Sequence, residues 1–115
     1  MTNNAYLVFA QKPDHVSRDE FYRWYADHAQ ENIESAGFVS AQRYSIREVI
    51  KGEAVGDEQH LAIYNYAGDM ATWRNDLNRR IANRDIILRD WHDQIGFKSW
   101  TCTPEGGLLT PKTRS

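Results

Sequence analysis

The chain has 115 residues, of which 41% are hydrophobic and 26% are charged, and its formal net charge is -2 at pH 7. This length allows one domain with one core. The near-neutral charge excludes the basic face of nucleic-acid-binding proteins, and no window approaches the run of about 18 apolar residues that a membrane span requires. We therefore expect neither nucleic acid nor a membrane as a partner.

The cysteine content and the N-terminal residues indicate where in the cell the protein is expected. Cys102 is the single cysteine and cannot form a disulfide within the chain, and the first residues lack the basic and apolar regions of a signal peptide. Both observations favour the cytoplasm. Aromatic residues are frequent, with four Trp, six Tyr and four Phe. Such a surplus suits a pocket for a flat, apolar or aromatic ligand.

The first expected element is a strand over residues 5–11. Its Tyr6 and Val8 face one side, and Leu7 and Phe9 face the other. Because both sides are apolar, we expect a central strand that is covered on both faces.

A helix should follow, because Ser17 and Glu20 have the spacing of a capping box and Gly37 can supply a left-handed C-terminal residue. At 3.6 residues per turn, one face of this helix collects three aromatic rings, an amide and an imidazole. These residues are Phe21, Trp24, Tyr25, His28 and Asn32. The imidazole therefore lies within an apolar stripe.

The period then changes to two, which predicts a strand over residues 38–49, a loop over residues 50–59 with two glycines, and a strand over residues 60–67. Asp69 caps a second helix, whose inner side is formed by Met70, Trp73, Leu77 and Ile81. A further helical stretch is expected from about residue 83 to 94, continuous or kinked, with Ile87, Leu88, Trp91 and Ile95 inside. Alternation over residues 97–103 predicts the last strand.

Four arginines of this helical region are interrupted by two aspartates, so we expect a solvated helix face. They are Arg74, Arg79, Arg80 and Arg84, with Asp76 and Asp85 between or beside them.

The element order βαββαβ predicts an α+β fold of the ferredoxin-like type, with a four-stranded antiparallel sheet and the helices on one face. We expect residues 1–103 to form this single domain and residues 104–115 to form an irregular tail, whose Leu108 and Leu109 can dock on a partner. The other sheet face also contains apolar residues, so a homodimer through the open sheet face is predicted.

The stretch from residue 19 to 44 resembles the EthD-type branch of the dimeric α+β barrel superfamily. The resemblance rests on Phe21, Trp24, Tyr25, His28, Gly37, Arg43 and Tyr44. It implies a small ligand between sheet and helices in each subunit. The superfamily includes polyketide cyclases and dehydratases, lactone isomerases, cofactor-independent monooxygenases and haem-handling proteins, so the fold does not decide the reaction.

His28 is the first candidate for catalysis. Burial among aromatic rings disfavours the charged imidazole and leaves a neutral base near pH 7, which Glu31, Asn32 or a strand tyrosine can orient. The alternative is a structural histidine. Tyr44 and Tyr64 are the candidate acids or oxyanion stabilisers, and Tyr44 is favoured because it lies in the motif. Arg43 points to the opposite face from Tyr44, so we expect it at the dimer interface or in a salt bridge.

The predicted substrate-binding residues are largely aromatic. They are Tyr6, Phe21, Trp24, Tyr25, His60 and Trp91. A solvated position is expected for His92, and His15 lies in a loop. No HxH, HExxH or CxxC spacing is present, so neither a metal nor another cofactor is expected.

These observations favour a cofactor-independent lyase or dehydratase, or a cyclase or isomerase, that acts on a small aromatic or polyketide-like substrate. Two alternatives stay open. One is a cofactor-independent or haem-handling monooxygenase, and the other is a non-catalytic small-molecule-binding or assembly domain.

Overall fold

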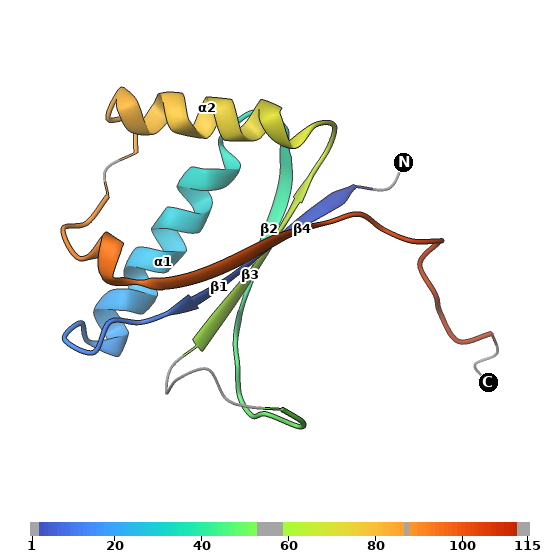
Figure 1. Cartoon of the computed structure of the whole chain (residues 1–115), viewed down its shortest axis with the longest axis horizontal. Coiled ribbons are helices and arrows are strands. Elements are labelled where there is room, and N and C mark those ends of the chain that lie inside the picture. The colour runs from blue at the N-terminus through green and yellow to red at the C-terminus, as the bar shows by residue number, and fades with distance from the viewer. Residues whose placement is uncertain (1–2, 53–58, 87, 113–115) are drawn as a thin grey trace.

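The computed structural model describes residues 3–52, 59–86 and 88–112, and it shows two helices on one side of a sheet (Figure 1). The elements are β1 (Asn4–Gln11), α1 (Arg18–Ile33), β2 (Phe38–Ser45), β3 (Gln59–Tyr66), α2 (Met70–Ala82), a 3-10 turn (His92–Gln94) and β4 (Gly96–Cys102). The four strands are ordered β2-β3-β1-β4, and every neighbouring pair is antiparallel. The ferredoxin-like α+β arrangement is confirmed, with β1 in a central position.

Helix α1 begins where the capping box predicts. The Ser17 side-chain oxygen accepts a hydrogen bond from the Glu20 backbone N–H at 3.1 Å, and Asp19 and Glu20 place negative charge in the first turn. The helix ends at Ile33. Gly37 lies in the following turn with φ of 94°, where a Cβ atom would be strained and would approach the Ala67 carbonyl to 3.6 Å.

Two side chains of α2 fasten the C-terminal end of α1. Asp76 accepts a hydrogen bond from the Ala36 backbone N–H at 2.9 Å, and Arg80 donates to the Glu31 carbonyl at 2.6 Å and to the Ser35 hydroxyl at 2.7 Å. A cation at the negative end of the α1 dipole is favourable. The expectation of a solvated arginine face is therefore wrong for Arg80.

The expected helix over residues 83–94 is absent from its described residues, and only the short 3-10 turn is helical there. Asn83 caps α2, and Arg84 has a positive φ of 63°. A straight continuation of α2 would carry Trp91 about 14 Å beyond Ala82. The chain instead folds back towards α1 (Figure 1), and Trp91 joins the core. Ile87 lies outside the described residues.

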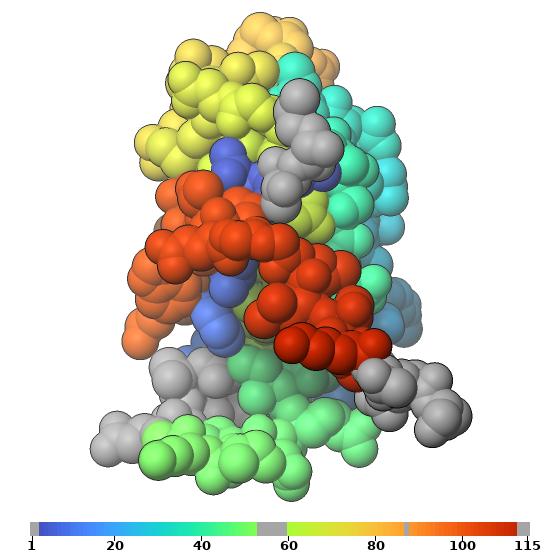
Figure 2. Space-filling view, turned by 90° about the vertical axis from the view of Figure 1, so that its right-hand side faces the viewer, coloured from blue at the N-terminus to red at the C-terminus, as the bar shows by residue number. Residues whose placement is uncertain are grey.

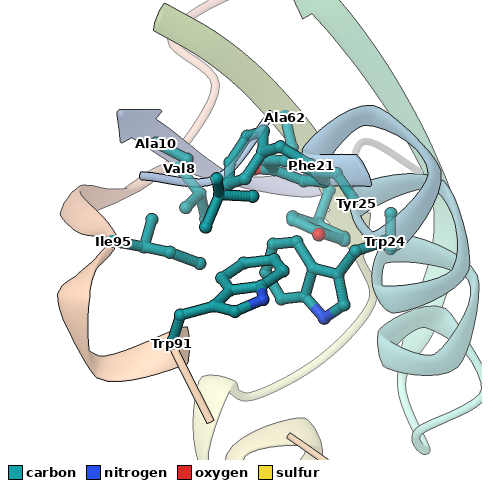
Figure 3. Packing of buried hydrophobic residues seen from close by; sticks show 11 residues of the cluster. Val8, Ala10, Phe21, Trp24, Tyr25, Ala62, Trp91 and Ile95 are labelled. Atoms are coloured by element: carbon teal, nitrogen blue, oxygen red, sulfur yellow. The ribbon is translucent and has the colours of Figure 1, made fainter. Parts of the chain in front are cut away.

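The strands have two different faces. On the inner face, which the helices cover, β3 buries His60, Ala62, Tyr64 and Tyr66. The core cluster of buried residues lies between this face and the helices (Figure 3). It consists of Val8, Ala10, Val16, Phe21, Trp24, Tyr25, Ala29, Ala62, Tyr64, Trp91 and Ile95.

A register shift in β2 decides which of its residues reach the inner face. Phe38 pairs with Tyr66, but Ser40 pairs with Asn65, the neighbour of Tyr66. Strand β2 therefore has one residue more than β3 at this point, as in a β-bulge. Beyond the shift, Arg43 pairs with Ala62 on the inner face, and Tyr44 pairs with Leu61 on the other face.

No helix of the described residues lies over the outer face. It contains Leu7 and Phe9 of β1, with Leu61, Ile63 and Trp100 opposite them in register. Phe9 meets Trp100 edge to face at 5.6 Å, and Trp100 is still 52% exposed. Figure 2 looks at this side of the molecule, with the C-terminal segment standing in front of the sheet. The prediction that β1 carries apolar side chains on both sheet faces is confirmed.

The length and the composition of the helices bear on membrane insertion. Within residues 3–52, 59–86 and 88–112, no helix combines the length and the apolar character needed to cross a membrane.

Candidate functional site

A cavity of about 260 Å³ lies between the inner sheet face and the helices. Its volume is close to the lower end of the range for small-molecule sites, about 300–1,000 Å³. Apolar side chains of α2 and β4 contribute much of the lining, and a few polar groups converge on it. The lining residues are Tyr6, Val8, Tyr25, His28, Asn32, Tyr64, Leu77, Ile81, Leu88, His92, Phe97 and Ser99.

His28 reaches the cavity from the third turn of α1. Its ring stacks on Trp24, with centroids 4.6 Å apart and planes at 17°. The Nδ1 atom is buried and has no hydrogen-bond partner among the described residues. A satisfied core histidine would have such a partner, so the hydrogen-bonding capacity of this nitrogen is unused among the described residues.

His92 lies beside His28, with ring centroids 5.6 Å apart. Burial, and then the neighbouring His92, lower the pKa of His28 from 6.5 to about 4. Burial likewise lowers the pKa of His92. Both imidazoles are therefore neutral near pH 7, since a second positive charge in this apolar region would be unfavourable.

Tyr64 and Asn32 form a polar pair in the cavity lining. The Asn32 side-chain N–H donates to the Tyr64 hydroxyl oxygen at 3.3 Å. That bond uses the hydroxyl as an acceptor and leaves its O–H able to donate. Burial raises the pKa of Tyr64, so the phenol stays protonated near pH 7. The Asn32 side-chain oxygen is buried without a partner among the described residues.

The structure brings four of the sequence-predicted site residues to the cavity: His28, Tyr64, Tyr6 and Tyr25. Three others lie behind it as core. Phe21 is fully buried, and Trp24 and Trp91 meet at 5.1 Å (Figure 3). Trp24 also supports the His28 ring, which stacks on it.

His60 is buried on the inner face but does not line the cavity. Its ring packs against Phe21 at 5.2 Å and against Tyr25 at 6.0 Å. The expected alignment of His60 with Tyr64 on one face is confirmed by their common burial on β3.

Tyr44 does not line the cavity, and the expectation that it faces the ligand is wrong. It lies on the outer face and is 48% exposed. Arg43 takes the inner position instead of the expected dimer interface or salt bridge, and its guanidinium lies 5.0 Å from the Tyr22 ring centroid. The physical reason is the register shift, because one added residue exchanges the faces of all later positions.

Sequence reasoning missed His92, Phe97, Ser99 and Leu88 as cavity residues. Asn32 was found on the correct helix face, but it bonds Tyr64 rather than orienting His28. The position of His92 depends on the irregular chain after α2, and its only sequence signal is the neighbouring Trp91, a large ring that must be buried. Metal binding has no obvious site, since the described residues contain no group of three or more His, Cys, Asp or Glu side chains that could hold an ion.

Comparison with known proteins adds the fold but no reaction. No family model matches the chain, and no curated protein matches its sequence. Among solved structures, the chain is similar to a putative monooxygenase from Shewanella loihica PV-4 with a TM-score of 0.54. The two share 11% sequence identity, and the alignment covers 93% of this chain and 99% of that chain. This likeness supports the ferredoxin-like fold, whereas membership of the dimeric α+β barrel superfamily and of its EthD branch stays a prediction.

Proposed function

We propose that the protein is an enzyme that removes a proton from a small, largely apolar substrate, with His28 as general base, and that it is a lyase of the dehydratase type. The observation that carries this proposal is the unpartnered Nδ1 of a neutral imidazole in a ligand-sized cavity. A neutral imidazole can accept a proton, and an imidazolium cannot.

The low basicity of His28 restricts the substrate. A phenol-like hydroxyl has a pKa of about 10, so moving its proton to a base with a pKa of about 4 costs about 8 kcal/mol. A turnover of about 10 per second allows a total barrier of about 16 kcal/mol. A much weaker acid would exceed that barrier, so the substrate should carry a phenolic or enolic hydroxyl or a similarly activated C–H bond.

Tyr64 supplies the second function. Its free O–H can donate to the oxygen that becomes negative when the proton leaves, and Asn32 holds the hydroxyl in position. In a dehydration, the resulting enolate expels a hydroxide from the β-carbon, and the proton on His28 joins it to give water. Protons and electrons then balance, and no redox partner is involved.

A monooxygenase is the second candidate, favoured by the name of the structurally similar protein from Shewanella loihica PV-4. The same deprotonation would begin this reaction, because a phenolate is more easily oxidised than a phenol. Oxygen uptake distinguishes the two: an oxygenase consumes dioxygen with the substrate, and a dehydratase works equally well without it.

The experiment uses a panel of bicyclic β-hydroxy ketones with a second carbonyl group on the α-carbon, which makes the C–H bond about as acidic as a phenol. Their loss of water to a phenol raises the near-ultraviolet absorbance. His28→Ala should lower turnover at least about a hundredfold, and Tyr64→Phe about tenfold. His15→Ala is the matched control, because His15 is exposed and outside the cavity. Unchanged turnover in a folded His28→Ala protein would remove the proposed base, and binding without turnover or oxygen uptake would support the non-catalytic alternative.

We also propose that two copies associate through the outer sheet face. The support is the apolar set of Leu7, Phe9, Leu61, Ile63 and Trp100, which no helix covers. A second copy would remove these side chains from water and leave the cavity on the inner face free. Sedimentation at micromolar concentration tests the proposal, and a stable monomer would contradict it.

A further inference from the structure

A second, smaller hollow lies where α1 passes the end of β2 and the beginning of β3. It has a volume of about 80 Å³, which suits a single functional group rather than a whole ring system. Its lining is more polar than that of the cavity and consists of Tyr22, Tyr25, Arg43, Tyr44, Ser45 and His60. Tyr25 contributes to both the hollow and the cavity, so its ring separates an apolar site from a polar one.

Among the described residues that line this hollow, Arg43 alone has a permanent charge. Its guanidinium carbon lies 5.0 Å from the ring centroid of Tyr22 and 5.9 Å from that of Tyr25. These ring contacts compensate part of its lost hydration but use none of its five N–H donors. Within the described part of the chain, no carboxylate pairs with Arg43, and its side chain donates no hydrogen bond.

We propose that this hollow is a binding site for the carboxylate group of a small organic acid, with Arg43 as the anchoring residue. A guanidinium supplies two parallel N–H donors that match the two oxygens of a carboxylate. Tyr22 and Ser45 line the same hollow, and a hydroxyl of this kind can donate a further hydrogen bond to a carboxylate oxygen.

The charge of the lining residues and the shape of the ligand both favour a carboxylate over a phosphate. The described lining residues contribute one full positive charge, which balances a monoanion, whereas a phosphate dianion would need a second cation. The planar shape of the carboxylate also fits a guanidinium held between two ring faces. Arg43 is half-buried and its ring contacts restrict its motion, so less side-chain entropy is lost on binding.

Arg43 also acts electrostatically on the cavity. Its charge lowers the pKa values of Tyr25 and Tyr64, opposing the larger effect of burial, which raises both. A carboxylate bound at Arg43 would neutralise this field. The site therefore adds an acidic ligand to what the molecule can recognise, and it does not depend on the reaction proposed at His28.

Calorimetric titration of the full chain with benzoate tests this site, with benzamide as the neutral analogue of the same shape. Benzoate should bind saturably and benzamide should not. Arg43→Gln should weaken benzoate binding at least tenfold, and Arg43→Lys should fall between the two, because it keeps the charge but loses the paired donors. Arg47→Gln is the matched control, since it removes the same charge at an exposed position four residues away.

Two results of the titration would overturn the proposed site. Equal benzoate affinity in wild type and a folded Arg43→Gln variant would overturn the site, as would the absence of benzoate binding by the wild type at millimolar concentration. Inorganic phosphate binding more tightly than benzoate would overturn the choice of a carboxylate. Circular dichroism establishes whether Arg43→Gln is folded. If it is not, Tyr22→Leu replaces it, and this variant should also weaken benzoate binding because it removes one ring that positions Arg43.

Discussion

The two faces of the sheet are built from alternate residues of the same strands, yet they have different environments. On β3, His60, Ala62, Tyr64 and Tyr66 are all buried on the inner face, whereas Leu61 and Ile63 on the outer face keep partial contact with water. The most apolar side chains of β3 therefore lie on its outer face, and the helices cover the face with the polar rings. The side chains buried on the inner face therefore line a cavity as well as form part of the core.

Two basic residues beside the inner face are buried to different depths. His28 can lose its proton, and burial keeps it neutral. Arg43 cannot lose its charge, and it lies at the edge of the same face, half-buried against Tyr22 and Tyr25. The depth of each group thus follows from whether it can become neutral, since an unpaired charge is far more costly to bury than a neutral ring.

The largest expected effect is on the inner face. Phe21 is fully buried and contacts Trp24 at 5.5 Å, Tyr25 at 5.7 Å and His60 at 5.2 Å. Phe21→Ala should lower the free energy of unfolding by about 3–5 kcal/mol, because it leaves a void between these rings. Tyr22→Ala, at the next position but 51% exposed, should cost about 1 kcal/mol or less. Urea denaturation measures both, and equal losses would show that the inner face is not the main source of stability.

A second effect on the inner face depends on pH. The unfolded His28 binds a proton near its ordinary pKa of 6.5, whereas the folded state does so only at about 4. Protonation therefore favours unfolding, and the free energy of unfolding should fall between pH 6.5 and pH 4, by about 3 kcal/mol at pH 4. The lowered pKa of His92 acts in the same direction.

His28→Leu removes this contribution, so the stability difference between variant and wild type should grow as the pH falls from 7 to 4. Denaturation curves at pH 7, 5.5 and 4.5 measure the slope, and the exposed His15→Leu serves as control. The same slope in wild type and His28→Leu would be incompatible with a neutral, buried His28.

The smallest effect on the fold is expected on the outer face. Trp100 is 52% exposed, so Trp100→Glu should change the unfolding free energy of a single copy by about 1 kcal/mol or less. The same change should abolish association, because it places a charge within the proposed contact. Gln94→Glu is the control, with the same change in charge at an exposed position outside this face. Sedimentation of both variants compares their masses in solution, and an unchanged mass for Trp100→Glu would contradict the proposed interface.

Local signals in the sequence were sufficient for most of the fold. The Ser17 cap, the alternation in β1 and β3 and the helical spacing of Phe21, Trp24 and His28 depend on neighbours within a few residues, and each is observed in the structure. Element ends were less well predicted. Residues 46–49 are not part of β2, and the helix expected after residue 83 was wrong.

What the sequence by itself determined is the order of elements, the α+β fold and the placement of His28 in an aromatic stripe, because periodicity and caps act over short distances. Only the tertiary structure decided that Arg43 rather than Tyr44 faces inward, and that His92 approaches His28. A bulge depends on how β2 fits against β3, and the path after α2 depends on where Trp91 can be buried. Both are settled by packing between segments far apart in the chain, which no local pattern records.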